Sequence, residues 1–390
     1  MTNPNPYFER DLTSSLAARM FQGKILVVTG PRQTGKTTLI AHFLSRPEWA
    51  DRVLSLNGDD TDTAALLSDA SPDRIRMLLG RKNILFLDEA QRIPSSGLVL
   101  KRLADSSSDL QIIVSGSSSL DLADRTAEPL TGRKFEWVLL PFSFAELAAR
   151  SSPLEERRLL ERRLVFGSYP DIATHPGDET DRLRVLVSSY LFKDVFRIRG
   201  IRHTELLERL LRAIALQCGS EVSFCEVART IGTDDKTVVR YLDLLERCFV
   251  VFRLPSYARN LRNELRKSRK IYFFDNGVRN AILGDFRPMP LRTDAGVLWE
   301  NHLMAERLKW RLAREPDTRA FFWRTADQKE IDLVEESADG LRAFEFKWNP
   351  KKAVRPPKAF LSAYPGATFA TVTPGNFDTF LLPPSSDSGI

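Results

Sequence analysis

Residues 24–37, KILVVTGPRQTGKT, run from an apolar stretch into a glycine-rich loop. The loop at 30–37 has the spacing G-x-x-x-x-G-K-[ST], and the helix-like TTLIAHFL follows it. Gly30 and Gly35 allow the backbone to curl so that successive N–H groups point at phosphate oxygens, and the helix N-terminus adds positive potential there. This strand, loop and helix predict a P-loop domain that binds ATP, with a glycine-rich turn of another α/β domain as the alternative.

Four side chains carry the predicted chemistry. We expect Lys36 to bridge the β- and γ-phosphates and Thr37 to place its hydroxyl on Mg²⁺. Residues 84–89, ILFLDE, are four apolar residues followed by two carboxylates, which suits a buried strand that ends at the ligand-binding edge of a sheet. Asp88 would hold Mg²⁺, and Glu89 would polarise the attacking water unless it is only a solvated charge.

Two further features are candidates for the same site. VSGSSS at 114–119 ends another strand, so Ser115, Ser117 or Ser118 is a candidate sensor of the γ-phosphate, with simple turn residues as the alternative. Arg133 precedes the strand FEWVLL and is either a cationic finger or an ordinary surface arginine. The predicted site comprises Glu89, Lys36 and Arg133 for catalysis, Thr37 and Asp88 for Mg²⁺, and Gly30, Pro31, Arg32, Gln33, Thr34, Gly35, Lys36, Thr37, Thr38 and Ser117 for the nucleotide.

Composition limits the class of protein. The 390 residues suffice for two or three domains of ~150 residues, and 43% hydrophobic with 28% charged residues is typical of folded chains. No apolar run reaches the ~18 residues that span a bilayer, and the start MTNPNPYFERDL lacks signal-peptide features, so we expect neither secretion nor a membrane. Three cysteines without a CxxC pair indicate the reducing cytoplasm, and the net charge of +6 favours acidic partners.

Short apolar strands alternate with helical stretches through the first half of the chain, which predicts an α/β fold with a parallel sheet. The strands are expected at 24–30, 52–57, 83–90, 110–116 and 135–141. A proline-bearing stretch at 285–289 marks a later boundary. The predicted domains are an N-terminal arm at 1–20, an ATPase domain at 21–150, a helical lid or connector at 151–216, a winged-helix domain at 217–284, a nuclease-like domain at 285–383 and a flexible tail at 384–390.

The middle segment has a helix-turn-helix outline. Ser223 can cap a first helix, residues 232–235 form the turn, and the start of the second helix would enter a DNA groove. A basic stretch follows where a wing would meet phosphates. A protein contact or a solvated charged face is the alternative. The candidate DNA-binding residues are Lys236, Thr237, Arg240, Arg259, Arg262, Arg266 and Lys267.

The stretch EIDLVEESADGLRAFEFKW predicts a β-hairpin, because Asp339-Gly340 favours a two-residue type I′ turn. That turn places Asp332 opposite Lys347, whereas a four-residue loop would pair Asp332 with Glu345. Both registers leave Asp332, Glu345 and Lys347 on one face. This is the D…ExK arrangement of PD-(D/E)xK nucleases, with Glu300 matching their additional helical carboxylate; a common surface ion pair is the alternative.

The successive motifs carry a family resemblance. GPRQTGKTTLI, ILFLDEAQRIP, VSGSSS and GRKFEWVLLPFSFAEL resemble a prokaryotic branch of the AAA+ ATPases related to archaeal and origin-recognition-like ATPases. KSRKIYFFDNGVRNAI, GVLWENHL and FFWRTADQKEIDLV resemble the C-terminal region of that branch. The resemblance implies an AAA+ ATPase, a winged helix and a restriction-endonuclease-like terminal domain. It also implies a homo-oligomer, such as a ring.

We therefore expect an ATPase that uses ATP and Mg²⁺ to bind or remodel DNA, and its terminal domain is a candidate metal-dependent nuclease. One alternative is a regulatory ATP switch whose C-terminal half binds a protein partner. The other is a nuclease for which DNA cleavage is the main output. DNA-stimulated ATP turnover and metal-dependent nicking separate these hypotheses.

Overall fold

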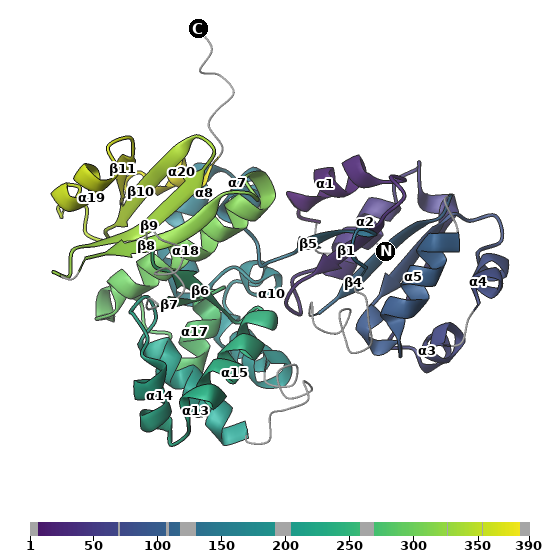
Figure 1. The fold of residues 1–390 in the computed structure, drawn as a ribbon, viewed down its shortest axis with the longest axis horizontal. Coiled ribbons are helices and arrows are strands. Elements are labelled where there is room, and N and C mark those ends of the chain that lie inside the picture. Colours follow the sequence, from purple (N-terminus) through teal and green to yellow (C-terminus); the bar gives the residue numbers. More distant parts are fainter. Residues whose placement is uncertain are drawn as a thin grey trace, which may run out of the picture. The chain divides into compact units, whose positions relative to one another are not determined.

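The computed structural model describes residues 7–68, 71–106, 109–117, 130–191, 204–257, 269–325, 327–352 and 354–382. The chain forms two compact units. The first comprises Met1–Pro141 and Arg247–Phe249, and the second comprises Phe142–Glu246 and the chain from Val250 onward. The first unit is purple and blue in Figure 1, and the second runs from blue-green to yellow.

The first unit is built on a five-stranded parallel sheet in the order β2-β3-β4-β1-β5. Its strands confirm those expected from the alternating apolar segments. They are β1 (Ile25–Thr29), β2 (Val53–Asn57), β3 (Ile84–Asp88), β4 (Gln111–Gly116) and β5 (Lys134–Val138). The three central strands are buried along their whole length, as apolar strands covered on both faces must be.

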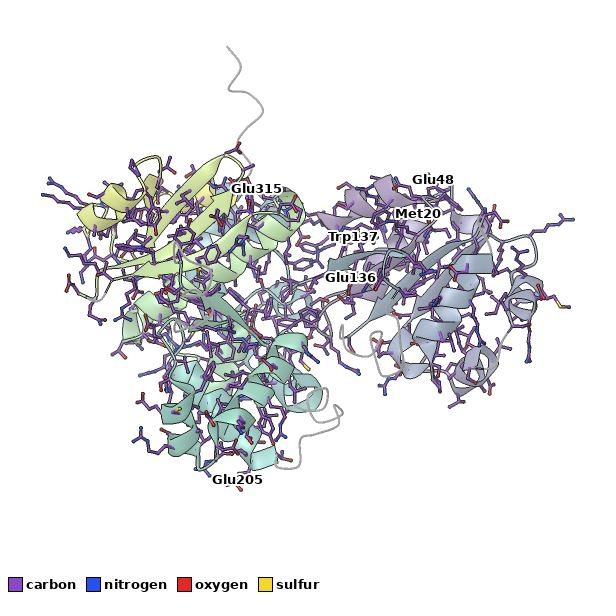
Figure 2. All side chains as sticks on the ribbon, viewed as in Figure 1. Met20, Glu48, Glu136, Trp137, Glu205 and Glu315 are labelled. Carbon is purple, nitrogen blue, oxygen red and sulfur yellow. The ribbon has the colours of Figure 1, made fainter. Side chains whose placement is uncertain are left out.

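Helices cover both faces of this sheet and create two apolar clusters. The helices are α1 (Leu12–Arg19), α2 (Lys36–Leu44), α3 (Thr61–Ser68), α4 (Pro72–Leu79) and α5 (Ser96–Ser106), with short 3-10 turns η1 (Ala50–Arg52) and η2 (Ala90–Arg92). One cluster joins Leu16 of α1 to the sheet, with Met20 and Trp137 packed at its margin (Figure 2). The sequence predicted residues 1–20 as a separate arm, whereas α1 packs into the first unit.

The second unit begins with a series of helices. They are α7 (Phe144–Arg150), α8 (Pro153–Arg158), α9 (Leu160–Phe166), α10 (Pro170–Ala173), α11 (Glu179–Val185), the π-helix η3 (Leu186–Leu191), α13 (Thr204–Leu216), α14 (Phe224–Ile231) and α15 (Asp235–Arg247). The predicted helix-turn-helix elements are present as α14 and α15. The Ser223 hydroxyl accepts a hydrogen bond from Glu226 N at 3.4 Å, and Gly232 ends α14 in the left-handed region.

An antiparallel pair, β6 (Val251–Pro255) and β7 (Arg269–Phe273), follows α15. Next come α17 (Asn276–Leu283), the turn η4 (Met289–Leu291) and the long helix α18 (Ala295–Arg314). The Asn276 amide donates to Leu164 O of α9 at 3.1 Å and to Leu298 O of α18 at 2.9 Å. These bonds join segments that the sequence assigned to three separate domains and that lie within one compact unit of the structure.

The unit ends in a four-stranded sheet of order β11-β10-β9-β8. The elements are β8 (Arg319–Arg324), β9 (Glu330–Ser337), β10 (Gly340–Phe346), α19 (Lys358–Ala363), β11 (Thr368–Val372) and α20 (Phe377–Leu381). The β9–β10 hairpin was expected, but its preferred register was wrong. Ser337 faces Gly340, so the turn is at 338–339 and the register continues to place Asp332 opposite Glu345.

Among the described residues, no helix combines the length and the apolar character that crossing a bilayer requires.

Candidate nucleotide site and carboxylate cluster

The P-loop lies between the end of β1 and the start of α2. Gly35 has φ 86°, a left-handed conformation that suits glycine, and α2 begins at Lys36. The buried Lys36 ammonium donates to Gly30 O at 2.9 Å and Pro31 O at 2.8 Å, so it points back across its own loop. A Cβ on Gly30 would collide with Leu139 O, which makes glycine necessary there for packing as well as for the loop.

Asp88 is the meeting point of three sheet-edge elements. Thr37 Oγ1 donates to Asp88 Oδ2 at 2.7 Å, and the Ser115 hydroxyl donates to Oδ1. These contacts form because β4 lies between β1 and β3, and parallel strands bring their carboxyl ends to one edge. The structure therefore brings together Lys36, Thr37 and Asp88, which the sequence placed in two separate motifs.

Glu89 follows Asp88 in a left-handed conformation, with φ 48°. Its carboxylate accepts a hydrogen bond from the Gln91 amide, which also donates to Ser117 Oγ at 3.0 Å. Gln91 thus connects the predicted water-polarising group to the predicted sensor. Sequence reasoning missed Gln91, although its place two residues after Glu89 was the available signal.

Arg10 is a second residue that the sequence did not reveal. It is 5% exposed, and its guanidinium donates to Thr34 O at 2.8 Å and to Leu140 O at 2.6 Å. The contacts span 24 and 130 positions of sequence, so no local pattern marks them. Arg10 holds the P-loop backbone against the segment that leaves β5.

The donor set of this edge fits Mg²⁺, which prefers oxygen ligands. The Thr37 hydroxyl and the Asp88 carboxylate already lie within hydrogen-bonding distance of each other. Gln33 and Thr38 are exposed beside the loop, whereas Pro31 and Thr34 are buried beneath it and Arg32 is half-buried. Of the predicted sensor serines, Ser118 lies outside the described residues.

Arg133 does not join this site. It precedes β5, and its carbonyl oxygen accepts from Ile25 N at 2.9 Å at the beginning of β1. Because β1 and β5 are parallel, Arg133 lies at the sheet edge opposite the P-loop. Its guanidinium pairs with Asp105 at 2.7 Å. Its assignment to this chain's own nucleotide site is therefore wrong, while a role toward a neighbouring copy stays a prediction.

The predicted DNA-binding residues are only partly visible. Lys236 and Arg240 are exposed on α15, and Thr237 is half-buried. Asp234 caps this helix by accepting hydrogen bonds from the N–H and the hydroxyl of Thr237, both at 2.9 Å, and these bonds lower the Asp234 pKa. The other candidates lie outside the described residues: Arg259, Arg262, Arg266 and Lys267.

The terminal sheet brings the predicted D…ExK residues together. Lys347 Nζ donates to Glu345 Oε1 at 2.6 Å, and Asp332 Oδ2 accepts from Phe346 N at 2.8 Å. Burial raises the Asp332 pKa well above its usual range, and the nearby carboxylates of Glu300 and Glu345 raise it further. Burial likewise raises the Glu345 pKa, although Lys347 opposes that change.

An unexpected ammonium lies among these carboxylates. Lys270 of β7 pairs with Glu300 at 3.1 Å, with Glu330, and at 3.9 Å with Asp332. Burial opposes the charged form of Lys270, but the three carboxylates more than offset it and raise its pKa. Arg324 pairs with Glu221 at 3.1 Å and with Glu330 at 3.5 Å.

The nuclease interpretation implies a divalent metal among these carboxylates. Throughout the part of the chain that the structure describes, no set of three or more His, Cys, Asp or Glu side chains is arranged to hold a metal ion. Sequence reasoning placed Lys270 in the basic stretch of the wing and missed its pairing with these carboxylates, because it lies on a different strand, 62 positions before Asp332, and no local motif spans that distance.

Three protein families match successive segments of the chain. Residues 22–148 match a family described as an AAA domain. Residues 157–288 and 295–381 match two domains of unknown function, DUF8612 and DUF4143. The gap between these two matches contains part of the boundary stretch expected from the sequence.

Similar whole proteins have been found in bacteria and archaea. An uncharacterised protein of Mycobacterium tuberculosis is 28% identical over 344 residues, covering 87% of this chain and 73% of that protein. Uncharacterised proteins of Haemophilus influenzae and Methanocaldococcus jannaschii are 25% and 24% identical over 285 residues, covering 67% and 68% of this chain and 69% and 63% of theirs.

A structure of C. elegans PCH-2 aligns with 61% of this chain and 66% of its own, at 16% identity and a TM-score of 0.27, which is too low to carry an argument. The P-loop geometry and the matched family together support a P-loop AAA-type ATPase over residues 22–148.

Proposed function

We propose that this chain is a Mg²⁺-dependent ATPase that couples ATP hydrolysis to an action on DNA. The observation that carries the ATPase proposal is the convergence of Thr37 and Ser115 on Asp88, beside the buried ammonium of Lys36. Phosphoryl transfer depends mainly on positioning and electrostatic stabilisation, and this arrangement supplies both.

Each residue of the edge has a definite part in the proposal. Thr37 and Asp88 would hold Mg²⁺, which neutralises charge on the phosphates when bound. Lys36 turns from its loop carbonyls to the phosphates, because an anion is a stronger partner for an ammonium than a neutral carbonyl is. Glu89 orients the attacking water and accepts its proton.

Two substitutions test the ATPase proposal, and they should have different effects on ATP binding and ATP turnover. We expect Lys36→Ala to abolish nucleotide binding or turnover, because the phosphates lose the ammonium that neutralises their charge. Glu89→Gln should keep ATP bound and slow turnover by at least ~100-fold, because an amide is a poor proton acceptor. ATP affinity and steady-state turnover are measured for both. Normal hydrolysis by Glu89→Gln would remove Glu89 from the mechanism.

The DNA part of the proposal comes from α15. Lys236 and Arg240 are exposed, four positions apart, near the N-terminal end of the second helix of the helix-turn-helix. Residues at i and i+4 share one face of a helix. This face is therefore cationic at the place where a recognition helix enters the major groove. The Asp234 and Asp235 carboxylates at the helix start reduce that positive potential.

A salt titration tests the DNA contact. We expect the double variant Lys236→Ala/Arg240→Ala to bind duplex DNA more weakly, with a log–log salt slope shallower by about 0.9 for each phosphate that the variant no longer neutralises. The matched control is Arg158→Ala/Arg184→Ala, which removes two cations that are 67% and 66% exposed elsewhere in the same unit.

Equal losses of DNA affinity in the double variant and the control would mean that DNA binding depends only on the net charge of the chain. An unchanged slope, together with ATP turnover that DNA does not stimulate, would favour the regulatory switch that binds a protein partner. Replacing Arg262, Arg266 and Lys267 with alanine should also flatten the slope if the basic stretch contacts phosphates.

A further inference from the structure

We propose that Lys270 takes the place of a divalent cation in the carboxylate cluster of the second unit. The D…ExK face is then a structural network of ion pairs and not a nuclease centre. The carboxylate cluster is Glu300, Glu330, Asp332 and Glu345. This inference concerns a different unit from the ATPase proposal and does not depend on it.

The position of the ammonium is the first argument. Lys270 is 2% exposed, and its Nζ lies 3.1 Å from Glu300 Oε1 and 3.9 Å from Asp332 Oδ1, and pairs with Glu330. Glu300 Oε1 also accepts a hydrogen bond from the Tyr272 hydroxyl at 2.7 Å. Glu300 Oε1, one of the oxygens that a nuclease metal would need, is therefore already directed at two hydrogen-bond donors. Glu345 Oε2, by contrast, is buried and has no hydrogen-bond partner within the described residues.

The backbone that carries Lys270 is the second argument. Lys270 is part of β7, where it pairs with Leu254 of β6, and it also forms an isolated antiparallel bridge with Glu221. Tyr272 is two positions further along β7, so period-two alternation puts both side chains on the same face of the strand. The backbone that carries the ammonium is thus paired along its length, and burial restricts the side chain itself.

Charge is the third argument. Within the described residues, Lys270, Lys347 and Arg324 all pair with members of the carboxylate cluster. Three cations therefore face four carboxylates in a setting that ranges from buried, at Lys270, to half-buried, at Arg324 and Glu330. A divalent ion added beside them would repel the Lys270 ammonium at short range, where little water screens the interaction. The cluster therefore joins β7 and α18 to the terminal sheet through its own charges.

The test uses the full chain without nucleotide, and Mn²⁺ as the probe. We expect calorimetry on the unmodified chain to show no Mn²⁺ binding that Asp332→Asn removes. Lys270→Gln should lower Tm, because the carboxylates lose their counter-charge. Added Mn²⁺ should restore Tm in Lys270→Gln, and the double variant Lys270→Gln/Asp332→Asn should lose that rescue.

Lys309→Gln is the matched control. Lys309 is also a buried lysine, 8% exposed, and it pairs with Glu306 at 2.6 Å away from the cluster. Its loss should lower Tm without rescue by Mn²⁺. Two results would overturn the proposal: Mn²⁺ binding by the unmodified chain that Asp332→Asn abolishes, or no Mn²⁺ uptake by a folded Lys270→Gln. If Lys270→Gln does not fold, the comparison of Mn²⁺ binding between the unmodified chain and Asp332→Asn, measured by calorimetry, tests the proposal.

Discussion

Gln91 is a single side chain whose amide lies between the groups proposed to orient water and to sense the γ-phosphate. It donates to Glu89 and, at 3.0 Å, to Ser117 Oγ. An amide that donates to a carboxylate fixes the orientation of that carboxylate. Gln91 is therefore a positioning residue in the proposed reaction, because it acts through Glu89.

We expect Gln91→Leu to lower ATP turnover by roughly 10-fold to 100-fold while leaving ATP affinity unchanged, since the loss concerns only the orientation of Glu89. Ser117→Ala breaks the other end of the bridge and should cause a smaller loss. The double variant should lose less than the product of the two single effects, because both act through one network. Full turnover in Gln91→Leu would contradict this role.

At this scale, sequence distance decides what could be predicted. Lys36 and Thr37 lie in one contiguous motif whose spacing has a chemical reason, so their places could be predicted. Lys270 and Arg10 act on residues far away in the chain, and their sequence neighbours give no sign of it. Arg133 was misassigned although the predicted parallel sheet already places a residue that precedes a strand at the edge opposite the ligand site.

Among the elements, α17 packs closely against α9 because glycine, whose side chain is a single hydrogen atom, occupies the contact. A Cβ on Gly277, in the first turn of α17, would collide with Phe166 O at the end of α9. The same helix is capped by the buried Asp275, whose side chain accepts from Val278 N at 3.1 Å. The approach of the two helices therefore leaves no room for a larger residue.

We expect Gly277→Ala to destabilise the second unit by about 1–3 kcal/mol, the usual cost of overpacking. In an ordinary helix interior, by contrast, replacing glycine with alanine stabilises the helix by up to ~1 kcal/mol. The matched control is Gly296→Ala in α18, because a Cβ there meets nothing within 4 Å. Urea unfolding of both variants checks the prediction. A stabilised Gly277→Ala would show that α9 can move away.

The hairpin β9–β10 shows why elements were easier to predict than their register. Alternation has a period of two, so the two registers considered put Asp332, Glu345 and Lys347 on the same face and bury the same apolar residues. Only the turn preference of Asp339-Gly340 distinguished them, and that preference gave the wrong pairing. The observed turn at 338–339 instead leaves Gly340 at φ 117° as the first residue of β10.

On the scale of the whole molecule, side-chain amides connect segments that the sequence assigned to different domains. The Asn280 amide donates to Val165 O at 2.7 Å, and the Asn301 amide donates to Phe273 O at 3.1 Å. Side-chain amides bonded to backbone carbonyls of distant segments leave no compositional trace. Phe142–Glu246 and the chain from Val250 onward thus form one compact unit even though their local patterns change twice.

The pH dependence of this unit should contain a contribution from His302. Burial lowers the pKa of His302 to about 4, because the imidazolium would lose its hydration. The unfolded imidazole, with its pKa near the ordinary ~6.5, therefore binds a proton that the folded one does not. Stability from this group is complete above the unfolded value and is lost as the pH falls from about 6.5 toward 4.

We expect this effect to lower the free energy of unfolding by about 2 kcal/mol between pH 7 and pH 5. His302→Gln, which cannot titrate, should show a pH dependence weaker by that amount. Urea unfolding of the second unit at the two pH values measures the difference. Equal pH dependence of the two chains would mean that the folded imidazole accepts a proton freely.

The sheet order of the first unit also has a consequence for biosynthesis. β1 is made early, but both of its neighbours, β4 and β5, come roughly a hundred residues later in the chain. At ~5–20 residues per second, translation of that interval takes on the order of ten seconds, during which an apolar strand has no partner on either side. The nascent chain is therefore exposed to aggregation until β5 leaves the ribosome, and protease sensitivity of stalled chains ending before or after β5 would measure that interval.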